Sequence, residues 1–269
     1  MTAEEPIRLN KHLALELGVS RREADDLIAA SKVIVNGIPA ILGARIVASD
    51  EIMVGAKLLG DTKVEKQYVA FHKPVGYVCS RRAQGDNPTI YSVLPAEFYA
   101  LKPVGRLDKD SSGIILLTND GDFAHQMTHP KFYKTKVYEV ELDHPLAPLH
   151  QQMISDYGLQ LEDGMSKFLI TKHSPVDAAH EEETALDSSK QSAARAPQSA
   201  RSEAVSGKQE PNISGQEYYE ITMQEGRNRQ IRRTFASLGY TVTRLHRTQF
   251  GNYSLGDIKS GEYETVDIR

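Results

Sequence analysis

The sequence lacks most of the features on which metal, redox and membrane functions depend. Cys79 is its single cysteine, so an intrachain disulfide and a cysteine-built zinc site are both excluded. No apolar run approaches the roughly 18 residues of a membrane helix, and Glu4 and Glu5 do not fit a transit peptide. GxSxG, P-loop and dinucleotide-binding motifs are missing as well. We therefore expect a cytoplasmic protein with no metal and no organic cofactor.

The chain also lacks a net positive charge. The 269 residues contain 32 Lys and Arg against 36 Asp and Glu, a formal net charge of −4. Residues 175–217, with 8 acidic and 4 basic side chains and no aromatic residue, account for this whole excess. Such a segment cannot bury enough apolar surface to fold, and we expect a disordered insertion there. In contrast, residues 225–247 hold six arginines and one glutamate, a local field suited to a phosphate backbone.

The most informative segment is GRLDKDSSGIILLTNDG at residues 105–121. Residues 114–117 have the composition of a buried strand, so Asp108 lies in the loop that enters a core strand, where chemistry can reach it. The DKDSSG start resembles a calcium loop, but Asn119 stands where the closing glutamate belongs, which argues against calcium. A purely structural turn, in which Asp110 caps backbone groups, stays open as an alternative.

A second segment, EGRNRQIRRTFASLG at residues 225–239, predicts a helix. Its apolar positions repeat at i, i+4 and i+7, at Ile231, Phe235 and Leu238. Arg229 and Arg233 project away from this apolar face, and a solvated basic surface explains them well enough. Arg232 lies on the margin of the face, where a half-buried guanidinium requires an anion.

The segment VYEVEL at residues 137–142 alternates as a half-buried strand. Tyr138, Val140 and Leu142 fall on its apolar face, and two glutamates fall on the other face. A tyrosine in this position is compatible with a core residue alone, because aromatic residues are common in strands.

The N-terminal segment has its own pattern of two short helices and a hairpin. Leucines at positions 9, 13 and 17 define the first helix, and Ser20 with Glu23 forms a capping box for the second. VIVNGIP then predicts a strand and an Asn36-Gly37 turn. Charged residues and Gly60 interrupt the apolar pattern at residues 56–67, which we interpret as a linker.

Five basic residues of this N-terminal segment are candidate RNA contacts. Arg21 and Arg22 occupy the first turn of the second helix, where the helix dipole disfavours cations. A phosphate bound by these guanidiniums and the free helix N–H groups would explain them, with Arg8, Lys11 and Lys32 as neighbours. The alternative is a solvated pair of arginines.

Four motifs together resemble one family in order and in spacing. They are KPVG at 73–76, GRLD at 105–108, VYEVEL at 137–142 and GRNRQIRR at 226–233. The chain resembles RNA pseudouridine synthases of the RsuA type, and its N-terminal pattern resembles the S4 domain that precedes the catalytic domain in that branch. The resemblance covers nearly the whole chain outside the insertion. It implies an α+β protein: a small S4 module, then a catalytic domain whose mixed, mainly antiparallel sheet is flanked by helices.

The resemblance also implies roles for individual residues. Asp108 is expected to be the catalytic aspartate, Arg232 to pair with it, and Tyr138 to stack on the target base. Arg106 is expected to enter the RNA stack at the place that the uridine has left. Further contacts with the substrate RNA are expected from four residues near the cleft, namely Lys73 on a nearby loop, Ile231, Arg227 and Arg229.

We therefore predict an S4 domain at residues 1–55, a linker at 56–67 and a catalytic domain at 68–269. The predicted reaction is the isomerisation of one uridine of ribosomal RNA by a monomer that flips the base into its cleft. The segment at 128–140, THPKFYKTKVYEV, is similar to enzymes that act on the large subunit. Two alternatives stay open: an assembly factor that binds ribosomal RNA without catalysis, and a metal-dependent RNA hydrolase that uses Asp108 and Asp110.

Overall fold

The computed structural model describes residues 5–59, 65–81, 84–173 and 217–268. The predicted insertion at 175–217 lies outside the described residues except for Glu217. Its two flanking segments are strands, as the sequence predicts. They are β13 (Leu169–His173) and β14 (Glu217–Met223), and they pair with each other in antiparallel register.

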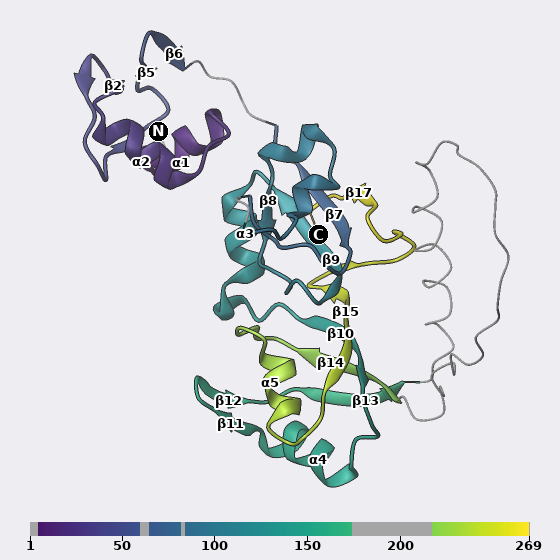
Figure 1. Cartoon of the computed structure of the whole chain (residues 1–269). Coiled ribbons are helices and arrows are strands. Elements are labelled where there is room, and N and C mark those ends of the chain that lie inside the picture. Colours follow the sequence, from purple (N-terminus) through teal and green to yellow (C-terminus); the bar gives the residue numbers. More distant parts are fainter. Residues whose placement is uncertain (1–4, 60–64, 82–83, 174–216, 269) are drawn as a thin grey trace, which may run out of the picture.

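The N-terminal residues fold around a core of their own (Figure 1). Helices α1 (Leu9–Glu16) and α2 (Arg21–Ala29) accompany a four-stranded sheet in the order β3-β2-β5-β6. Its strands are β2 (Val33–Val35), β3 (Ile38–Pro39), β5 (Ile52–Val54) and β6 (Lys57–Leu59), and a separate pair joins β1 (Ile7–Arg8) to β4 (Arg45–Ile46). The capping box of Ser20 and Glu23 forms as predicted.

Both hairpin turns of this unit depend on left-handed backbone. Asn36 and Gly37 have φ of 51° and 79°, which is the predicted tight turn between β2 and β3. Gly55, with φ of 61°, turns β5 into β6. Because β6 completes this sheet, the sheet extends to residue 59, into the segment 56–67 that was predicted as a linker.

The rest of the chain is built on a nine-stranded mixed sheet. Its path runs β13-β14-β10-β15-β9-β7-β17, with β16 beside β15 and β8 beside β9. The bounds are β7 (Tyr68–Lys73), β8 (Lys102–Val104), β9 (Ser112–Thr118), β10 (Lys136–Leu142), β15 (Val242–Phe250), β16 (Tyr253–Ser254) and β17 (Tyr263–Thr265). β15 and β9 pair in parallel, and the other paired strands are antiparallel, so the predicted mixed sheet is confirmed.

Helices and short turns cover this sheet and connect its strands. The helices are α3 (Gly121–Thr128), α4 (Pro148–Gln152) and α5 (Gln230–Ala236). The shorter elements are η1 (Ile90–Ser92), η2 (Ala96–Ala100), η3 (Pro130–Phe132) and η4 (Met153–Tyr157), and β11 (Leu159–Leu161) pairs with β12 (Gly164–Ser166) in a hairpin.

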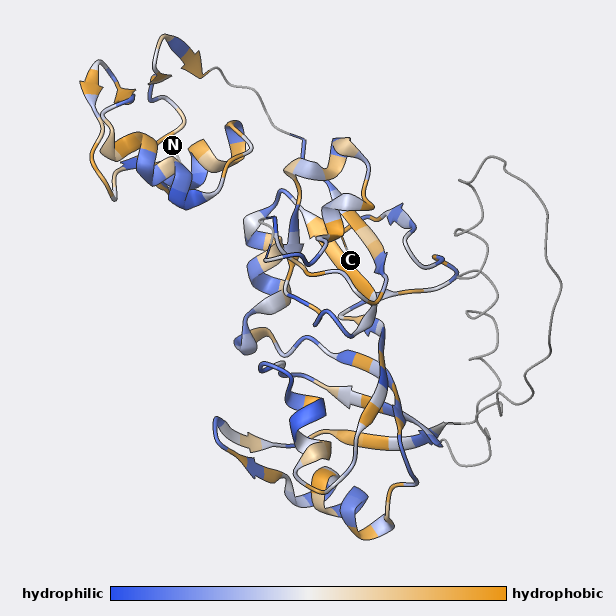
Figure 2. Ribbon diagram, viewed as in Figure 1, coloured by the Kyte–Doolittle hydropathy of each residue, from blue (hydrophilic) through white to orange (hydrophobic). Residues whose placement is uncertain are grey.

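The centre of the sheet is buried on both faces. Along β9, Ile115 and Leu117 join one apolar cluster with the α5 residues Ile231 and Phe235, whereas Ile114 and its same-face neighbours join a second cluster with α3. This two-sided burial explains why the strand sequence is continuously apolar. In Figure 2 the ribbon is accordingly hydrophobic along the middle of β7 and of β9.

Gly113 makes the parallel contact between β9 and β15 possible. It lies opposite Arg247 in the pair, with φ of +106°. A Cβ atom at this position would lie 2.2 Å from the Arg247 carbonyl oxygen, closer than real atoms approach. Glycine is therefore required here, both for backbone conformation and for space. The approach also brings the loop before β9 next to β15 and α5.

Candidate functional site

A cavity of about 500 Å³ lies where four parts of the region built on the nine-stranded sheet meet. Its wall is formed by the loop before β9, by β10, by β15 and by the segment that leads into α5. The lining residues include Gly105, Arg106, Leu107, Asp108, Ser111, Thr128, Pro130, Lys136, Tyr138, Leu245, Arg247 and Phe250, together with residues 223–231. The cavity therefore brings together Asp108, Tyr138 and the start of α5, which are far apart in the sequence.

The loop that carries Asp108 is held from beneath by Lys73. The Lys73 ammonium is fully buried and donates to the carbonyl oxygens of Ser111 at 2.6 Å and Pro74 at 2.9 Å. Burial lowers the pKa of this ammonium to about 8. The Asp108 side chain above it stays 29% exposed to the cavity.

The structure places Lys73 differently from the loop position at which a substrate contact was predicted. It is the last residue of β7 instead of a loop residue, and its side chain turns inward under the 108–111 loop because unpaired backbone carbonyls there need a donor. Lys73 still lies beside the loop that carries Asp108, at the same corner of the fold.

Two arginines and Asp110 connect this loop to α5. Arg229 donates from Nη1 and Nη2 to the two carboxylate oxygens of Asp110, at 2.9 Å each, and its Nη1 lies 3.9 Å from Asp108. Arg232 lies 3.4 Å from the Asp110 carboxylate and donates to the Asp110 carbonyl at 2.7 Å. The Arg229 bonds hold the pKa of Asp110 below its ordinary value.

The direct pair of Arg232 with Asp108 that the resemblance implied does not form in this structure. Among the described residues, the carboxylate in ion-pair contact with Arg232 is that of Asp110. The Arg232 side chain is 12% exposed, and a second donor bond to the Val242 carbonyl at 2.6 Å fixes the guanidinium in place. Arg232 thus contacts the Asp108 loop at two points, the backbone carbonyl of Asp110 and the carboxylate of Asp110.

Helix α5 begins later than predicted. Its first residue is Gln230, whereas the pattern at residues 225–239 suggested a start near 225. Arg229 adopts a left-handed conformation with φ of 47°, and the Arg227 backbone N–H bonds the Gln230 side chain at 3.1 Å. Residues 225–229 therefore form a turn at the mouth of the cavity instead of a first helical turn.

The predicted apolar face of α5 is buried, as expected. Ile231 and Phe235 are 5% and 0% exposed, and Ile231 also lines the cavity. Leu238 packs against the same cluster.

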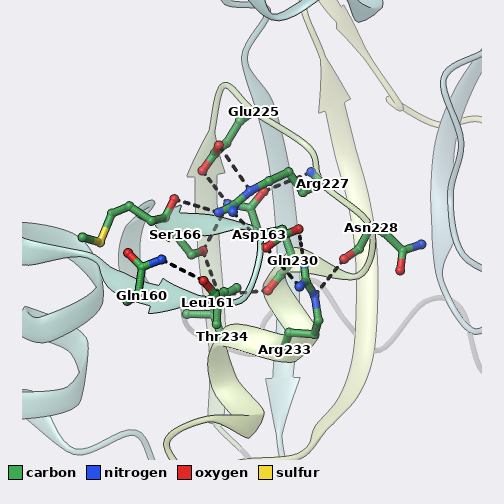
Figure 3. Close-up of polar contacts among 11 residues, drawn as sticks. Gln160, Leu161, Asp163, Ser166, Glu225, Arg227, Asn228, Gln230, Arg233 and Thr234 are labelled. Atoms are coloured by element: carbon green, nitrogen blue, oxygen red, sulfur yellow. Dashed lines mark hydrogen bonds and ion pairs between the residues drawn. The ribbon is translucent and has the colours of Figure 1, made fainter.

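A polar cluster joins the β11–β12 hairpin to α5 (Figure 3). Asp163 accepts from Arg227 at 3.0 Å and from both terminal nitrogens of Arg233, at 3.0 and 2.6 Å. Gln230 is buried and donates to Glu225 and to Ser166. Arg227 and Arg233 are therefore engaged with acids of the same chain, and Arg233 does not form the free basic surface that its helical position suggested.

Tyr138 faces the cavity from the apolar side of β10, as the alternation predicted, and it is 8% exposed. Arg247 lies beside it, with Cζ 6.0 Å from the Tyr138 ring centroid and 4.7 Å from that of Phe250. Arg247 is 2% exposed and donates from Nε to the Ile114 carbonyl at 2.9 Å. Its Nη2 finds no hydrogen-bond partner among the described residues.

Arg247 and Lys136 are cavity residues that the sequence did not single out. Lys136 is half-buried and donates to the Gln224 carbonyl at 3.2 Å, and burial lowers its pKa to about 8. Arg247 is a charged residue inside β15, next to buried residues of the same strand. This charge within a buried part of a strand is the sequence feature that could have identified it. A buried guanidinium with an unpaired donor at a cavity wall is suited to hold an oxygen of a ligand.

The predicted RNA contacts of the N-terminal unit are spread over its surface. Arg8, Arg21, Arg22 and Lys32 are exposed, and Arg21 with Arg22 opens α2 as predicted. Arg21 donates to the Asn10 side chain at 3.1 Å.

Lys11 forms a contact that the sequence did not predict. Its ammonium pairs with Asp122 of α3 at 2.6 Å, so it bridges the two parts of the chain. Near this bridge, Lys102 of β8 donates to the Val19 carbonyl at 3.0 Å.

Two classes of site have no representative in the part of the chain that the structure describes. No group of three or more His, Cys, Asp or Glu side chains is placed to hold a metal ion. No helix there has the length and apolar character to cross a membrane.

Comparison with known proteins gives a consistent result. Residues 67–237 match the family model described as RNA pseudouridylate synthase. Ribosomal small subunit pseudouridine synthase A of Yersinia pestis is 31% identical, over 97% of this chain and 94% of that protein. Ribosomal large subunit pseudouridine synthase B of Bacillus subtilis (strain 168) is 29% identical, over 95% and 90%. A solved structure described as a pseudouridylate synthase is 28% identical, with a TM-score of 0.57 over 97% of this chain and 96% of that one.

Proposed function

The chain belongs to the RNA pseudouridylate synthase family, and we propose that it converts one uridine of ribosomal RNA to pseudouridine, with Asp108 as the essential carboxylate. The observation that carries the assignment of Asp108 is its position: a partly exposed carboxylate at a cavity that also holds Tyr138 and the start of α5. Relatives named for the small and for the large subunit have similar identity, so the comparison favours neither subunit. A ribosomal substrate implies that the enzyme acts in the cytoplasm.

The chemistry requires a carboxylate in an enclosed cavity. The N1–C1′ glycosidic bond breaks, the uracil turns, C5 bonds to C1′, and the proton that leaves C5 is replaced by one on N1. Asp108 acts as nucleophile or as proton acceptor without a separate activating base. Arg229, at 3.9 Å, and Arg232, through Asp110, keep the carboxylate loop in one orientation.

The remaining cavity residues bind the extruded nucleotide. Tyr138 stacks on the uracil, an interaction of about 1 to 3 kcal/mol that offsets much of the cost of unstacking the base. The unpaired Nη2 of Arg247 donates to an oxygen of the bound nucleotide, which satisfies a buried donor. Arg106, exposed at the cavity mouth, fills the place that the base leaves in the RNA.

We further propose that the N-terminal unit, predicted at residues 1–55, is an S4-type RNA-binding unit and that the enzyme acts as a monomer. The exposed guanidiniums of Arg21 and Arg22 at the start of α2 support a phosphate contact there. Arg8 and Lys32 are exposed on the same unit and add positive charge.

The test is an Asp108→Asn variant assayed on ribosomal RNA from a strain that lacks the gene. We expect pseudouridine formation to fall at least about 10³-fold, because the variant loses both nucleophile and proton acceptor. RNA binding should stay within about twofold, since the side chain keeps its shape. Carbodiimide modification followed by reverse transcription locates the isomerised uridine. Retained turnover in Asp108→Asn would refute the assignment, and binding without any isomerisation by the wild-type protein would favour an assembly factor.

A further inference from the structure

We propose that residues 131–134, which we call the KFYK turn, form a second RNA-binding surface that holds the nucleotides next to the flipped uridine. This inference rests on the proposed function and extends it to the RNA outside the cavity. The turn comprises the end of η3 and the two residues that follow, between α3 and β10. Neither the family match nor the named relatives assign a role to it.

The KFYK turn lies at the edge of the cavity. Thr128 and Pro130, which precede it, line the cavity, and so do Lys136 and Tyr138, which follow it in β10. The KFYK turn is therefore within reach of RNA that delivers a base to Tyr138.

The turn exposes two large aromatic rings. Tyr133 is 68% exposed and Phe132 is 38% exposed. Tyr133 also has a left-handed backbone, with φ of 47°, which is rare for a bulky residue and is held here by a bond from its N–H to the Pro130 carbonyl at 3.0 Å. An exposed ring kept in an unfavourable conformation beside a cavity is suited to stack on an unpaired base.

The charge around the turn is of one sign. Residues 123–138 contain no acidic side chain. In the described part of the chain, neither Lys131 nor Lys134 forms an ion pair. Lys131 instead lies over the Phe132 ring, with its Nζ 4.8 Å from the centroid. Two unpaired ammonium groups beside two exposed rings match a nucleic-acid backbone with a stacked base.

The turn packs against two exposed histidine rings. The rings of His125 and His129 are 4.7 Å apart, and they lie 5.9 and 6.3 Å from the ring of Phe132. The His129 side chain also accepts from the Lys131 backbone N–H at 3.3 Å. These ring contacts and this hydrogen bond restrict the conformations of the turn, which limits the entropy lost on binding.

The experiment compares steady-state isomerisation and RNA binding for two variants, with unmodified ribosomal RNA transcripts as the probe. Tyr133→Asn removes the ring but keeps a residue that tolerates the left-handed backbone. We expect its KM to rise about tenfold while kcat changes by less than about twofold, because the ring contacts RNA outside the reacting base. Lys131→Ala combined with Lys134→Ala should reduce the slope of log K against log salt by about 1.5.

Matched controls come from the same chain. Tyr157, 72% exposed in η4, and Lys259, exposed before β17, do not line the cavity. Tyr157→Asn and Lys259→Ala should leave KM and the salt slope unchanged.

If the wild type isomerises RNA and the turn variants behave like these controls, the inference is overturned while the proposed function stands. It is also overturned if the variants lose activity on assembling ribosomal particles and not on naked RNA, because the turn would then contact a protein. A wild type that isomerises nothing would refute the proposed function itself.

Discussion

The two rims of the cavity are both rich in basic residues, and they differ in what those residues contact. On the α5 side, Arg229 bonds Asp110, while Arg227 and Arg233 bond Asp163. On the other side, Lys131 and Lys134 form no ion pair within the described residues. The comparison teaches that a basic segment is not by itself an RNA-binding surface. A basic side chain that is already in an ion pair with a carboxylate holds parts of the protein together. A basic side chain without such an ion pair is available to bind a phosphate of the RNA.

Asp110→Ala should produce the largest change on the α5 side. Arg229 loses both its bonds and Arg232 loses its carboxylate, so the loop that carries Asp108 shifts from its productive position. We expect kcat to fall about 10²-fold, as a misplacement of about 1 Å does in other enzymes.

RNA affinity in the same variant should not fall. The released Arg229 becomes available to phosphate, so the slope of log K against log salt should steepen by up to about 1. Asp257→Ala, at an exposed acid outside the cavity lining, is the control. Single-turnover rates and filter binding measure the two effects separately. A loss of affinity in Asp110→Ala with kcat unchanged would contradict this division of roles.

Acid pH should weaken the same contact in a predictable direction. The Arg229 bonds hold the pKa of Asp110 below its ordinary value of 3.8. Because the folded pKa is the lower one, the contact stabilises the fold above about pH 3.8 and is lost as the pH falls below that value. The melting temperature of the wild type should therefore decrease between about pH 5 and pH 3 by about 2 °C more than that of Asp110→Asn. Calorimetry at both pH values tests this, and equal decreases would show that the pair does not stabilise the fold.

Arg233→Ala should have the smallest effect on RNA. Its guanidinium is engaged by Asp163, so affinity and salt slope should stay within about twofold of the wild type. The expected change is structural. Amide hydrogen exchange in the β11–β12 hairpin should become faster, because Asp163 loses Arg233 and is then held by Arg227 alone. Lys259→Ala, at an exposed residue before β17, serves as the control for exchange. A large loss of RNA affinity in Arg233→Ala would remove the distinction between the two rims.

Much of the local structure could be predicted from the sequence. The capping box at Ser20 and Glu23, the Asn36-Gly37 turn and the apolar side of β10 at Tyr138 all form as expected. These features depend on residues close together in the chain, and their propensities and periodicities are strong there. The loop position of Asp108 before a buried strand is of the same kind.

Three details of the site did not follow from local pattern. The helical periodicity from 225 onward hid the turn that ends at Arg229, because an apolar face says little about where a helix starts. Lys73 looked like a substrate contact, but its donors serve backbone carbonyls of another loop. Arg247 stayed unnoticed within a strand, since its unpaired Nη2 is visible only when the cavity wall is assembled.

The sequence by itself determined the family motifs, the strands and helices that carry them, and the surplus of arginine at 225–247. Only the tertiary structure decided which of those arginines are paired. The acid that binds Arg229 lies 119 residues away in the sequence, and the acid that binds Arg227 and Arg233 lies 64 to 70 residues away. Charge pairing depends on distance in space, and at such separations that distance is set by how β9, β15 and the β11–β12 hairpin pack around α5.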